Sequence, residues 1–559
     1  MSNAIEKKQY PGLIVGYHKK LGYLVYRGQQ FVALAAPTRS GKGVSFVIPN
    51  LLTYPDSMVV LDLKLENFKY TSKFRAEHGQ DVFLFAPFSE SGETHCWNMF
   101  DAVRARAKHL WFGDLLTMGE TFYPSDVDVK TKFFNDNARN LFIGLALYLL
   151  ETPSLPCTGG EIFRQGSGYG KPVKTHIKEL MMSRLTDSAA GPKLSRECID
   201  ALNRFLGQPD ITLGNILSTF NAPLLIFADP IVDAATSKSD FDLGNVRKKR
   251  MTVYFGVTPD RLQGGDAGLL INLFFSQLLI LNMRELPQNN PELKYQCAVL
   301  NDEMTAVGRI NIIAKSNPYI AGYNLRLMTV IQSPAQLEDE KLYGVHGTRT
   351  LLTNHALQIW FPPKEQKDAE EYSKYLGTFT MKSRARSRSY GKGTTTGTND
   401  SDQKRELMKP QELRKMKQHE QIITLENMNA IRCEKAFFYA DRLFVDRLKA
   451  LSPYLASLKK KMPSQMQLEH AAFVLRELES KVPTLDLAAL YAESQKPRAT
   501  PAPVTLRAVR PDEIATLKAT DIANYEQMKE SLYKLLPGFA NVANAMSQIS
   551  GATAAVVNA

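Results

Sequence analysis

The stretch "LAAPTRSGKGVSFVIPN", from Leu34 to Asn50, constrains the fold more than any other part of the sequence. An apolar strand runs into a short loop that contains Gly-Lys-Gly, and a helix then begins. This is the order of a phosphate-binding loop, G-x-x-x-x-G-K-[ST], with two departures. Ala36 stands where that pattern has its first Gly, and Gly43 stands where it has a hydroxyl residue.

A loop of this kind binds phosphate because successive backbone N–H groups turn inward where the helix begins. Gly41 allows the close backbone approach, and Lys42 adds a positive charge beside the β- and γ-phosphates. Ala36 is compatible with the loop if its φ is negative. Gly43 is the larger departure, because Ser or Thr there normally offers its hydroxyl to Mg²⁺, and the metal would then need another oxygen. The alternative interpretation is a plain strand-to-helix turn with an exposed lysine.

A pair of acidic residues, Asp302 and Glu303, ends the apolar strand "CAVLNDE". Two carboxylates at the tip of a buried strand are costly unless a positive group lies nearby. In a Walker B motif, Asp302 would hold Mg²⁺ through water, and Glu303 would orient and deprotonate the attacking water. The alternative is that the pair only caps the next helix. Combined with the lysine loop in one sheet, the pair favours a nucleotide site.

Two further polar residues end apolar strands. Gln332 ends the strand in "VIQSPAQL", where its amide would contact the γ-phosphate or the attacking water and report whether the nucleotide is intact. Considered alone, Gln332 is a strand-end residue that makes turn bonds. Asp62 ends "VVLDLK", and we expect it near the edge of the nucleotide, with a strand-end turn as the competing interpretation.

Apolar strands alternate with helical segments, which predicts a parallel sheet covered on both faces. From about Arg104 to Phe227, apolar residues recur at three- and four-residue spacing, which predicts an all-helical insertion. Low apolar content predicts a mobile loop or linker over Arg384 to Asp402. The segment Glu434 to Asp441 is predicted to be the last strand. The other expected strands lie at residues 10–37, 57–64, 81–87, 250–257, 295–303, 325–333 and 355–361.

Composition excludes several classes of protein. A chain of 559 residues predicts two or three domains. The net charge of +12 permits contact with nucleic acid or an anionic membrane surface without showing either. Five scattered cysteines have no metal-ligand spacing, which predicts reduced thiols and no zinc site. The most apolar run, Leu269 to Met283, is too short to span a bilayer and predicts a buried helix. "SNA" after Met1 looks like a cloning scar.

Together these segments resemble the type IV secretion coupling proteins, the conjugative DNA-transfer ATPases of the RecA-like, FtsK/HerA-type superfamily. The resemblance extends from about Gly12 to Asp441, and the motifs agree in order and spacing. In that family the loop often reads T-R-S-G-K-G, so Gly43 looks like a family trait and Ala36 a local departure. The segments that carry the resemblance are "APTRSGKGVSFVIPNLL", "VVLDLKLENF", "WNMF", "SDFDL", "TVYFGVTPD", "NDEMTAVGRI", "AGYNLRL", "IQSPAQLEDEKLYG" and "LMKPQELRKM".

The resemblance implies an α/β fold: a RecA-like P-loop NTPase domain with a central, mostly parallel sheet, interrupted by an all-α domain and followed by a helical and flexible C-terminal extension. The implied domains are a nucleotide-binding domain in two parts (1–103 and 229–452), the all-α domain (104–228) and the extension (453–559). It also implies a homo-hexamer with nucleotide at the subunit interfaces. An arginine from a neighbouring subunit would complete each site, with Arg309 and Arg326 as candidates.

The activity implied by the resemblance is ATP hydrolysis coupled to translocation, with ATP and Mg²⁺ as cofactors. The implied partners are relaxase-bound DNA, secreted protein substrates, accessory proteins and inner-membrane components of a type IV secretion system. Family members usually begin with two transmembrane helices, so we expect this chain to be a soluble fragment from the cytoplasmic face of a bacterial inner membrane. The expected catalytic residues are Lys42, Glu303 and Gln332, and the expected metal ligand is Asp302. The expected nucleotide-binding residues are Thr38, Arg39, Ser40, Gly41, Lys42, Gly43, Val44 and Asp62.

Two alternative functions remain open at this stage. One is a P-loop helicase or assembly motor unrelated to secretion. The other is a substrate-docking receptor with little or no ATPase activity, which the departures at Ala36 and Gly43 suggest. The intact Lys42, Asp302 and Glu303 argue against the receptor.

Overall fold

A large mixed sheet organises the part of the chain that the structure describes. The computed structural model describes residues 10–186, 192–263, 266–390 and 394–495. The strands of the sheet are β1 (Gly12–His18), β2 (Gly22–Arg27), β3 (Val32–Ala35), β4 (Ser57–Asp62), β5 (Asp81–Phe85), β6 (Met251–Gly256), β7 (Cys297–Asp302), β8 (Leu325–Ile331), β9 (Leu357–Trp360), β12 (Glu420–Leu425) and β13 (Ile431–Glu434). Their order across the sheet is β2-β1-β13-β12-β9-β3-β8-β7-β4-β6-β5.

The strands from β9 to β5 in this order all run parallel to their neighbours, as the alternating pattern predicts. Strand β8 lies between β3 and β7, with Ala35 opposite Ile331 and Asp302 opposite Val330. The carboxyl ends of parallel strands meet at one edge of a sheet, and ligands bind outside that edge. The loop after β3, the acidic pair at the end of β7 and the polar end of β8 therefore come together there.

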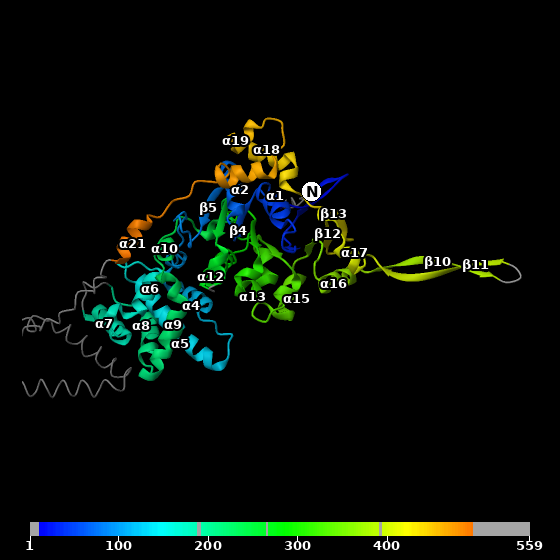
Figure 1. Cartoon of the computed structure of the whole chain (residues 1–559). Coiled ribbons are helices and arrows are strands. Elements are labelled where there is room, and N and C mark those ends of the chain that lie inside the picture. The colour runs from blue at the N-terminus through cyan, green and yellow to red at the C-terminus, as the bar shows by residue number, and fades with distance from the viewer. Residues whose placement is uncertain (1–9, 187–191, 264–265, 391–393, 496–559) are drawn as a thin grey trace, which may run out of the picture. The chain divides into compact units, whose positions relative to one another are not determined.

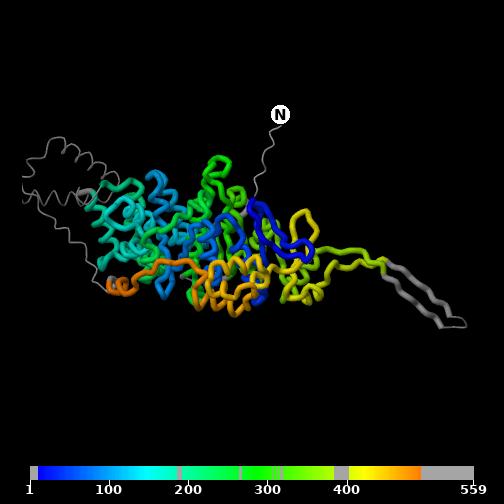
Figure 2. The backbone as a smooth tube through the Cα atoms, turned by 90° about the horizontal axis from the view of Figure 1, so that it is seen from above, coloured from blue at the N-terminus to red at the C-terminus, as the bar shows by residue number. Residues whose placement is uncertain are grey.

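The other edge of the sheet is antiparallel. Strand β12 pairs with β9 and β13, and β1 pairs with β13 and β2. In Figure 2 the blue N-terminal strands accordingly lie beside the yellow late segment. The predicted last strand over Glu434 to Asp441 is wrong, because β13 ends at Glu434 and a 3₁₀ turn follows at Phe438–Ala440. The backbone of the earlier residues 431–434 makes the ladder instead.

Alternate side chains on each central strand enter two different cores. On β4, Val59 and Leu61 join one cluster, whereas Met58 and Val60 join the other. Helix α12 (Asp266–Asn282), the predicted buried helix, contributes to the first cluster, and α2 (Glu66–Glu77) contributes Phe68 to the second. Figure 1 shows α2 and α12 on opposite sides of β4 and β5. The sheet is thus covered on both faces, as predicted.

The described chain between β5 and β6 consists of helices joined by turns and loops and adds no strand to the sheet, in agreement with the predicted insertion. Its hydrophobic residues belong to the same buried cluster as those of α12. The domain boundaries at residues 104 and 228 stay a prediction. The α-helices of this part are α3 (Asp101–Arg104), α4 (Trp111–Phe122), α5 (Val129–Leu150), α6 (Gly159–Gly166), α7 (Val173–Thr186), α8 (Arg196–Leu206), α9 (Asp210–Leu224) and α10 (Pro230–Ala235).

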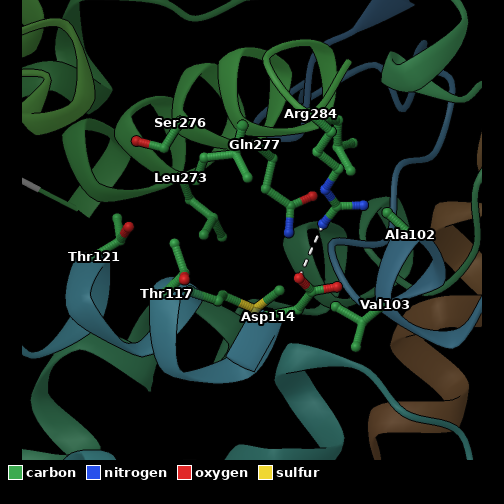
Figure 3. Close-up of a pocket in the computed structure, with 12 residues that line it drawn as sticks. Ala102, Val103, Asp114, Thr117, Thr121, Leu273, Ser276, Gln277 and Arg284 are labelled. Carbon is green, nitrogen blue, oxygen red and sulfur yellow. Dashed lines mark hydrogen bonds and ion pairs between the residues drawn. The ribbon is translucent and has the colours of Figure 1, made fainter. Parts of the chain in front are cut away.

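Helix α4 joins the insertion to α12 around a small cavity of about 30 Å³. Figure 3 shows Asp114 of α4 facing Arg284, which follows α12. An Nη of Arg284 donates to Asp114 at 3.0 Å, and Arg106 also donates to Asp114, at 2.5 and 2.7 Å. One carboxylate held by two guanidinium groups ties the insertion to the helix that covers the sheet.

One helical stretch among the described residues, Asp210–Ala228, is long and apolar enough, by length and composition, to cross a bilayer. Leu213, Ile216 and Phe220 on this stretch are buried, and α9 packs against α5 and α6. The core helix of a soluble protein passes the same test, so this stretch is only weak support for a membrane segment.

Two long strands, β10 (Thr378–Tyr390) and β11 (Thr394–Glu406), form a separate antiparallel hairpin. Their register runs from Thr378 opposite Glu406 to Tyr390 opposite Thr394. The predicted loop or linker over Arg384 to Asp402 is therefore wrong outside residues 391–393, which the structure does not describe. Low apolar content shows only that a segment has no core to join, and a backbone ladder forms without one.

The chain beyond β13 packs against α2. Leu455, Leu468 and Leu478 are buried in one cluster with Tyr70 and Phe74 of α2. The described chain therefore stays in contact with the face of α2 well past residue 452, where the sequence predicts that an extension begins. Residues 496–559 of the predicted extension lie outside the described residues. The helices of this part are α18 (Arg442–Leu451), α19 (Pro453–Ser457), α20 (Gln465–Glu469), the π-helical turn η10 (His470–Val474) and α21 (Leu487–Gln495).

The remaining helices connect the later strands. They are α13 (Asn311–Ile320), α14 (Pro334–Leu337), α15 (Gly344–Thr353), α16 (Gln366–Leu376) and α17 (Pro410–Arg414).

Candidate functional site

The loop after β3 has the backbone that a phosphate-binding loop needs. The N–H of Ala36 donates to the Ile331 carbonyl at 2.8 Å, so this fully buried residue simply continues the ladder to β8. Its φ is not positive, which is the condition under which alanine was expected to fit. Arg39 (φ 61°) and Gly41 (φ 87°) take the left-handed conformation that turns the chain. At Gly41 that conformation favours glycine.

Gly43 is not required by packing. It opens a helical run made of the π-helical turn η1 (Gly43–Val47) and helix α1 (Ile48–Leu51), and a Cβ at this position would meet no atom within 4 Å. A serine or threonine would fit there. The missing hydroxyl is therefore a chemical feature of the loop and has no steric cause.

Lys42 points from this loop to the acidic pair at the end of β7. Its ammonium forms an ion pair with Glu303 and lies 3.5 Å from Oδ1 of Asp302. The three side chains are partly buried. The predicted proximity of the loop lysine and the two carboxylates, 260 residues apart in the sequence, is confirmed in the structure. The roles of these residues in nucleotide chemistry stay predictions.

Gln332 connects Glu303 back to the loop. Its amide Nε2 donates to Oε1 of Glu303 at 2.6 Å, and its Oε1 accepts from the hydroxyl of Thr38 at 2.7 Å. Glu303 itself has φ 86° and ψ 57°, a left-handed conformation that is unfavourable for a residue with a side chain. Strained backbone of this kind persists where the surroundings over-determine it, often at functional sites. Here Lys42 and Gln332 hold the carboxylate from two sides.

Asp62 lies beside this group at the end of β4. It is 1% exposed, and the backbone N–H of Phe68 donates to its Oδ2 at 2.8 Å. Asn67 Nδ2 lies 3.5 Å from an oxygen of Asp62 and 3.5 Å from an oxygen of Asp302. Burial raises the pKa of Asp62 to about 7; the Phe68 N–H opposes this shift, and the charge of Asp302 adds to it. Asp62 therefore carries a proton more readily than a surface aspartate does.

Asp302 is the carboxylate best placed to hold a cation. Burial raises its pKa, and the charge of Lys42 opposes that shift. Its buried Oδ1 accepts no hydrogen bond among the described residues, and its near charged neighbour is the Lys42 ammonium at 3.5 Å. No group of three or more His, Cys, Asp or Glu residues in the described chain could hold a metal. Mg²⁺ in nucleotide sites needs only one or two carboxylates together with phosphates and water, so this donor set fits Mg²⁺.

Sequence reasoning missed two lysines that donate hydrogen bonds to backbone carbonyls of the loop. Lys435 is buried, donates to the Ser40 carbonyl at 2.9 Å and lies 3.7 Å above the centre of the Phe361 ring. Burial lowers its pKa to about 8. Lys364 donates to the Thr38 carbonyl at 2.9 Å. Nothing in the local sequence signals either contact, because Lys435 lies 395 residues from Ser40.

The two arginine candidates differ sharply in position. Arg326 is fully buried, donates Nε to the Gln30 carbonyl at 2.9 Å and lies 4.9 Å from the Tyr26 ring centre. It therefore cannot reach a neighbouring subunit, and it is an internal residue of the sheet. Arg309 is exposed just after the acidic pair. Of the two, only Arg309 remains a candidate.

A parallel sheet with a Gly-Lys loop after one strand and an acidic pair at the end of another defines the class of P-loop α/β proteins. Within this class, the chain belongs to the family described as "Type IV secretory system Conjugative DNA transfer", whose model matches residues 3–465. It is thus a member of the coupling-protein family.

Two relatives illustrate the relationship. Protein VirD4 of Agrobacterium fabrum is 29% identical over 427 residues, which cover 75% of this chain and 60% of that protein. Conjugal transfer protein TraG of Escherichia coli is 26% identical over 374 residues, which cover 65% of this chain and 57% of that protein. The chain thus matches about 60% of the length of these relatives.

The fold is similar to that of the coupling protein TrwB. The unbound conjugative coupling protein TrwBdeltaN70 matches with a TM-score of 0.52 and 15% identity, over 73% of this chain and 85% of that chain. TrwB in complex with the non-hydrolysable ATP analogue ADPNP matches with a TM-score of 0.51 and 14% identity, over 73% and 86% of the two chains. The predicted α/β fold with a mostly parallel sheet is confirmed.

Proposed function

We propose that this chain is the ATPase part of a type IV secretion coupling protein and uses ATP hydrolysis to drive the translocation of its substrates. One observation carries the proposal: Lys42, Asp302, Glu303 and Gln332, from three neighbouring parallel strands and their loops, share one network of contacts. Membership of the coupling-protein family supports the same activity. TrwB, which has a similar fold, has been solved with an ATP analogue.

The loop from Thr38 to Val44 would bind the triphosphate. Its backbone N–H groups would donate to the phosphate oxygens, with Gly41 giving the close approach. The ammonium of Lys42, now paired with Glu303, would exchange that partner for phosphate oxygens. The same exchange would free the Glu303 carboxylate to accept a proton.

The acidic pair would divide two tasks. Asp302, with Asp62 close by, would hold Mg²⁺, which when bound supplies charge neutralisation at the phosphates. Glu303 would orient the attacking water and accept its proton. Gln332, which now bridges Thr38 and Glu303, would keep that carboxylate in position and contact the γ-phosphate.

Membership of the coupling-protein family also supports a proposal for the assembly and the partners. We propose a homo-hexamer in which Arg309 of one subunit completes the nucleotide site of the next, at the cytoplasmic face of a bacterial inner membrane. The proposed partners are relaxase-bound DNA, secreted proteins and the inner-membrane components of the secretion system. The relatives named VirD4 and TraG support this assignment.

The decisive test compares phosphate release from ATP by the wild type and by Lys42→Ala. Loss of the ammonium removes charge stabilisation in the transition state, so the variant should lose at least about 100-fold in turnover. Its circular dichroism and melting temperature should remain close to those of the wild type, since Lys42 is partly exposed.

Undiminished turnover by Lys42→Ala would refute the site assignment. Absence of turnover in the wild-type oligomer, despite nucleotide binding, would instead favour a substrate-docking receptor. Separation of the strands of a forked duplex by the isolated protein would favour a helicase.

A further inference from the structure

A second cavity, of about 580 Å³, adjoins the phosphate-binding loop. Gly43 and Val44, directly after Lys42, form one end of it. The opposite wall comes from the chain between Gln465 and Val474, which we call the 465–474 segment. This volume lies within the range of small-molecule sites in proteins. The family match ends at residue 465, so this wall lies almost entirely beyond the matched region.

The cavity is walled by aromatic rings at fixed angles. Tyr70 packs edge-to-face against Phe438, with ring centres 5.3 Å apart, and against Phe473, with ring centres 5.4 Å apart. Each ring comes from a different part of the chain: α2, the turn after β13 and the 465–474 segment. Rings held in this way form surfaces on which a flat aromatic ligand stacks. Stacking is stronger for larger bases.

Polar groups in the same cavity suit the edge of a base better than a phosphate. The carboxylates of Glu66 and Glu469 line it, and both would repel a phosphate. A carboxylate instead accepts N–H groups, which adenine presents at its amino group. Burial, with smaller contributions from Glu469 and Glu66, raises the pKa of Tyr70, so its hydroxyl stays a donor. Gly43 and Val44 thus form the end of the cavity next to the phosphate-binding loop, and Glu469 lines the wall where the edge of the base would lie.

Two π-helical turns line this one cavity. Gly43 and Val44 belong to η1, and His470, Phe473 and Val474 belong to η10. π-helical turns are rare and are found frequently at functional sites. Leu468 of the 465–474 segment is fully buried. The chain on either side of the segment is held as well, because Lys73 donates to the carbonyls of Leu451 and Glu477 at 2.8 and 2.9 Å. Packing within the folded chain therefore holds this wall of the cavity in position.

We propose that this cavity binds the base of the nucleotide and that the 465–474 segment selects purine nucleotides, with Phe473 stacking on the base. This inference rests on the proposed function, because it takes the loop to hold the phosphates of the same molecule. It assigns to the late part of the chain a direct role in nucleotide recognition.

The test measures the binding of ATP, CTP and inorganic tripolyphosphate to the full chain by isothermal titration calorimetry. Tripolyphosphate has the charge without the base. The wild type should bind ATP at least about tenfold more tightly than tripolyphosphate and more tightly than CTP. Equal affinity for ATP and tripolyphosphate would overturn the base pocket, and equal affinity for ATP and CTP would overturn the purine selection.

Two variants and one matched control test whether the base of ATP binds in this cavity. Phe473→Ala should weaken ATP binding about tenfold and leave tripolyphosphate binding unchanged. Val474→Trp should do the same by filling the cavity, and it should fold normally because Val474 is 66% exposed. The control Leu475→Ala, directly after the segment and outside the cavity, should bind both ligands as the wild type does.

The outcomes separate this inference from the proposed function. If ATP binds and depends on Lys42, yet both Phe473→Ala and Val474→Trp retain full ATP affinity, the pocket is refuted and the proposed function stands. If the wild type binds neither ATP nor tripolyphosphate, or if Lys42→Ala binds both as the wild type does, the proposed function fails and this inference fails with it.

Discussion

At the scale of single residues, the protonation of each carboxyl group in the site depends on its burial and on the charged groups beside it. Asp62 is buried next to a second carboxylate, Asp302, and neither forms an ion pair as close as that between Lys42 and Glu303. Because burial disfavours the charged form, the folded protein holds a proton on Asp62 to a pKa of about 7, against an ordinary value of 3.8. The folded state therefore binds this proton more tightly than the unfolded chain.

This difference makes stability depend on pH in a defined direction. The stability that neutral Asp62 contributes is fully present below about pH 4 and is lost as the pH rises toward 7. Asp62→Asn removes the titration while it keeps an oxygen that accepts from Phe68. The quantity to compare is the free energy of unfolding of the variant minus that of the wild type. We expect this difference to be about 2–4 kcal/mol larger at pH 8 than at pH 4.

Urea denaturation of both proteins at pH 4, 6 and 8 measures this difference. Asp446→Asn, an exposed residue of α18, is the control and should show no such trend. A gain for Asp62→Asn that is the same at all three pH values would contradict the proton linkage.

At the scale of elements, the short helices after β13 are held by a few buried contacts. Ser464 is the N-cap of helix α20, and its side chain and that of Gln467 form a capping box. The buried residue of α20 is Leu468. Leu468 packs in the cluster that includes Tyr70 and Phe74 of α2. Short helices are unstable alone, so tertiary packing holds α20 in position beside the phosphate-binding loop.

Truncation of the Leu468 side chain should therefore destabilise both α20 and the hydrophobic cluster that it packs in. Leu468→Ala leaves a cavity under α20, and we expect the free energy of unfolding to fall by about 2–4 kcal/mol. Met466→Ala, on the same helix at a residue that is 78% exposed, should change it by less than about 0.5 kcal/mol. Urea titration of both variants measures the contrast, and similar values for the two would show that α20 is not anchored through Leu468.

At the scale of the whole molecule, the proposed ring needs an arginine that reaches the nucleotide site of a neighbouring chain. Arg309 is exposed and follows the acidic pair closely in the sequence, whereas Arg326 is enclosed in the sheet. In the proposed ring, Glu303 and Arg309 act at one interface but come from different chains.

This arrangement predicts complementation between two inactive variants. Glu303→Gln and Arg309→Ala should each lose at least about tenfold in ATP turnover as pure oligomers, because each removes one contributor from every interface. In mixed oligomers, an interface that pairs Arg309 of the first variant with Glu303 of the second is complete. Phosphate release should therefore rise above the sum of the two separate activities.

A mixture no more active than its components would argue against a shared site, provided that mass photometry shows mixed oligomers. Full activity of pure Arg309→Ala would remove this arginine from the mechanism.

Local pattern in the sequence was enough to predict the parallel sheet and the proximity of Lys42 to the two carboxylates. Strands such as β4 and β7 are mostly apolar runs. Lys42 lies in the loop after β3, Asp302 ends β7, and Gln332 directly follows β8. In a parallel sheet, chain direction alone brings those ends to one edge. The same reasoning failed for the hairpin β10–β11, because a backbone ladder needs no apolar pattern.

Contacts between distant segments depend on strand order and packing, which no local pattern encodes. Lys435 supports Ser40 because β13 lies in the same sheet as β3, although the two strands are far apart in the chain. The charge of Arg326 would suit a surface residue, yet the strands around it enclose its side chain. The wall that the 465–474 segment forms beside Gly43 likewise arises from the packing of Leu468 onto α2. Burial is a property of neighbours in space, and for these residues the neighbours come from elsewhere in the chain.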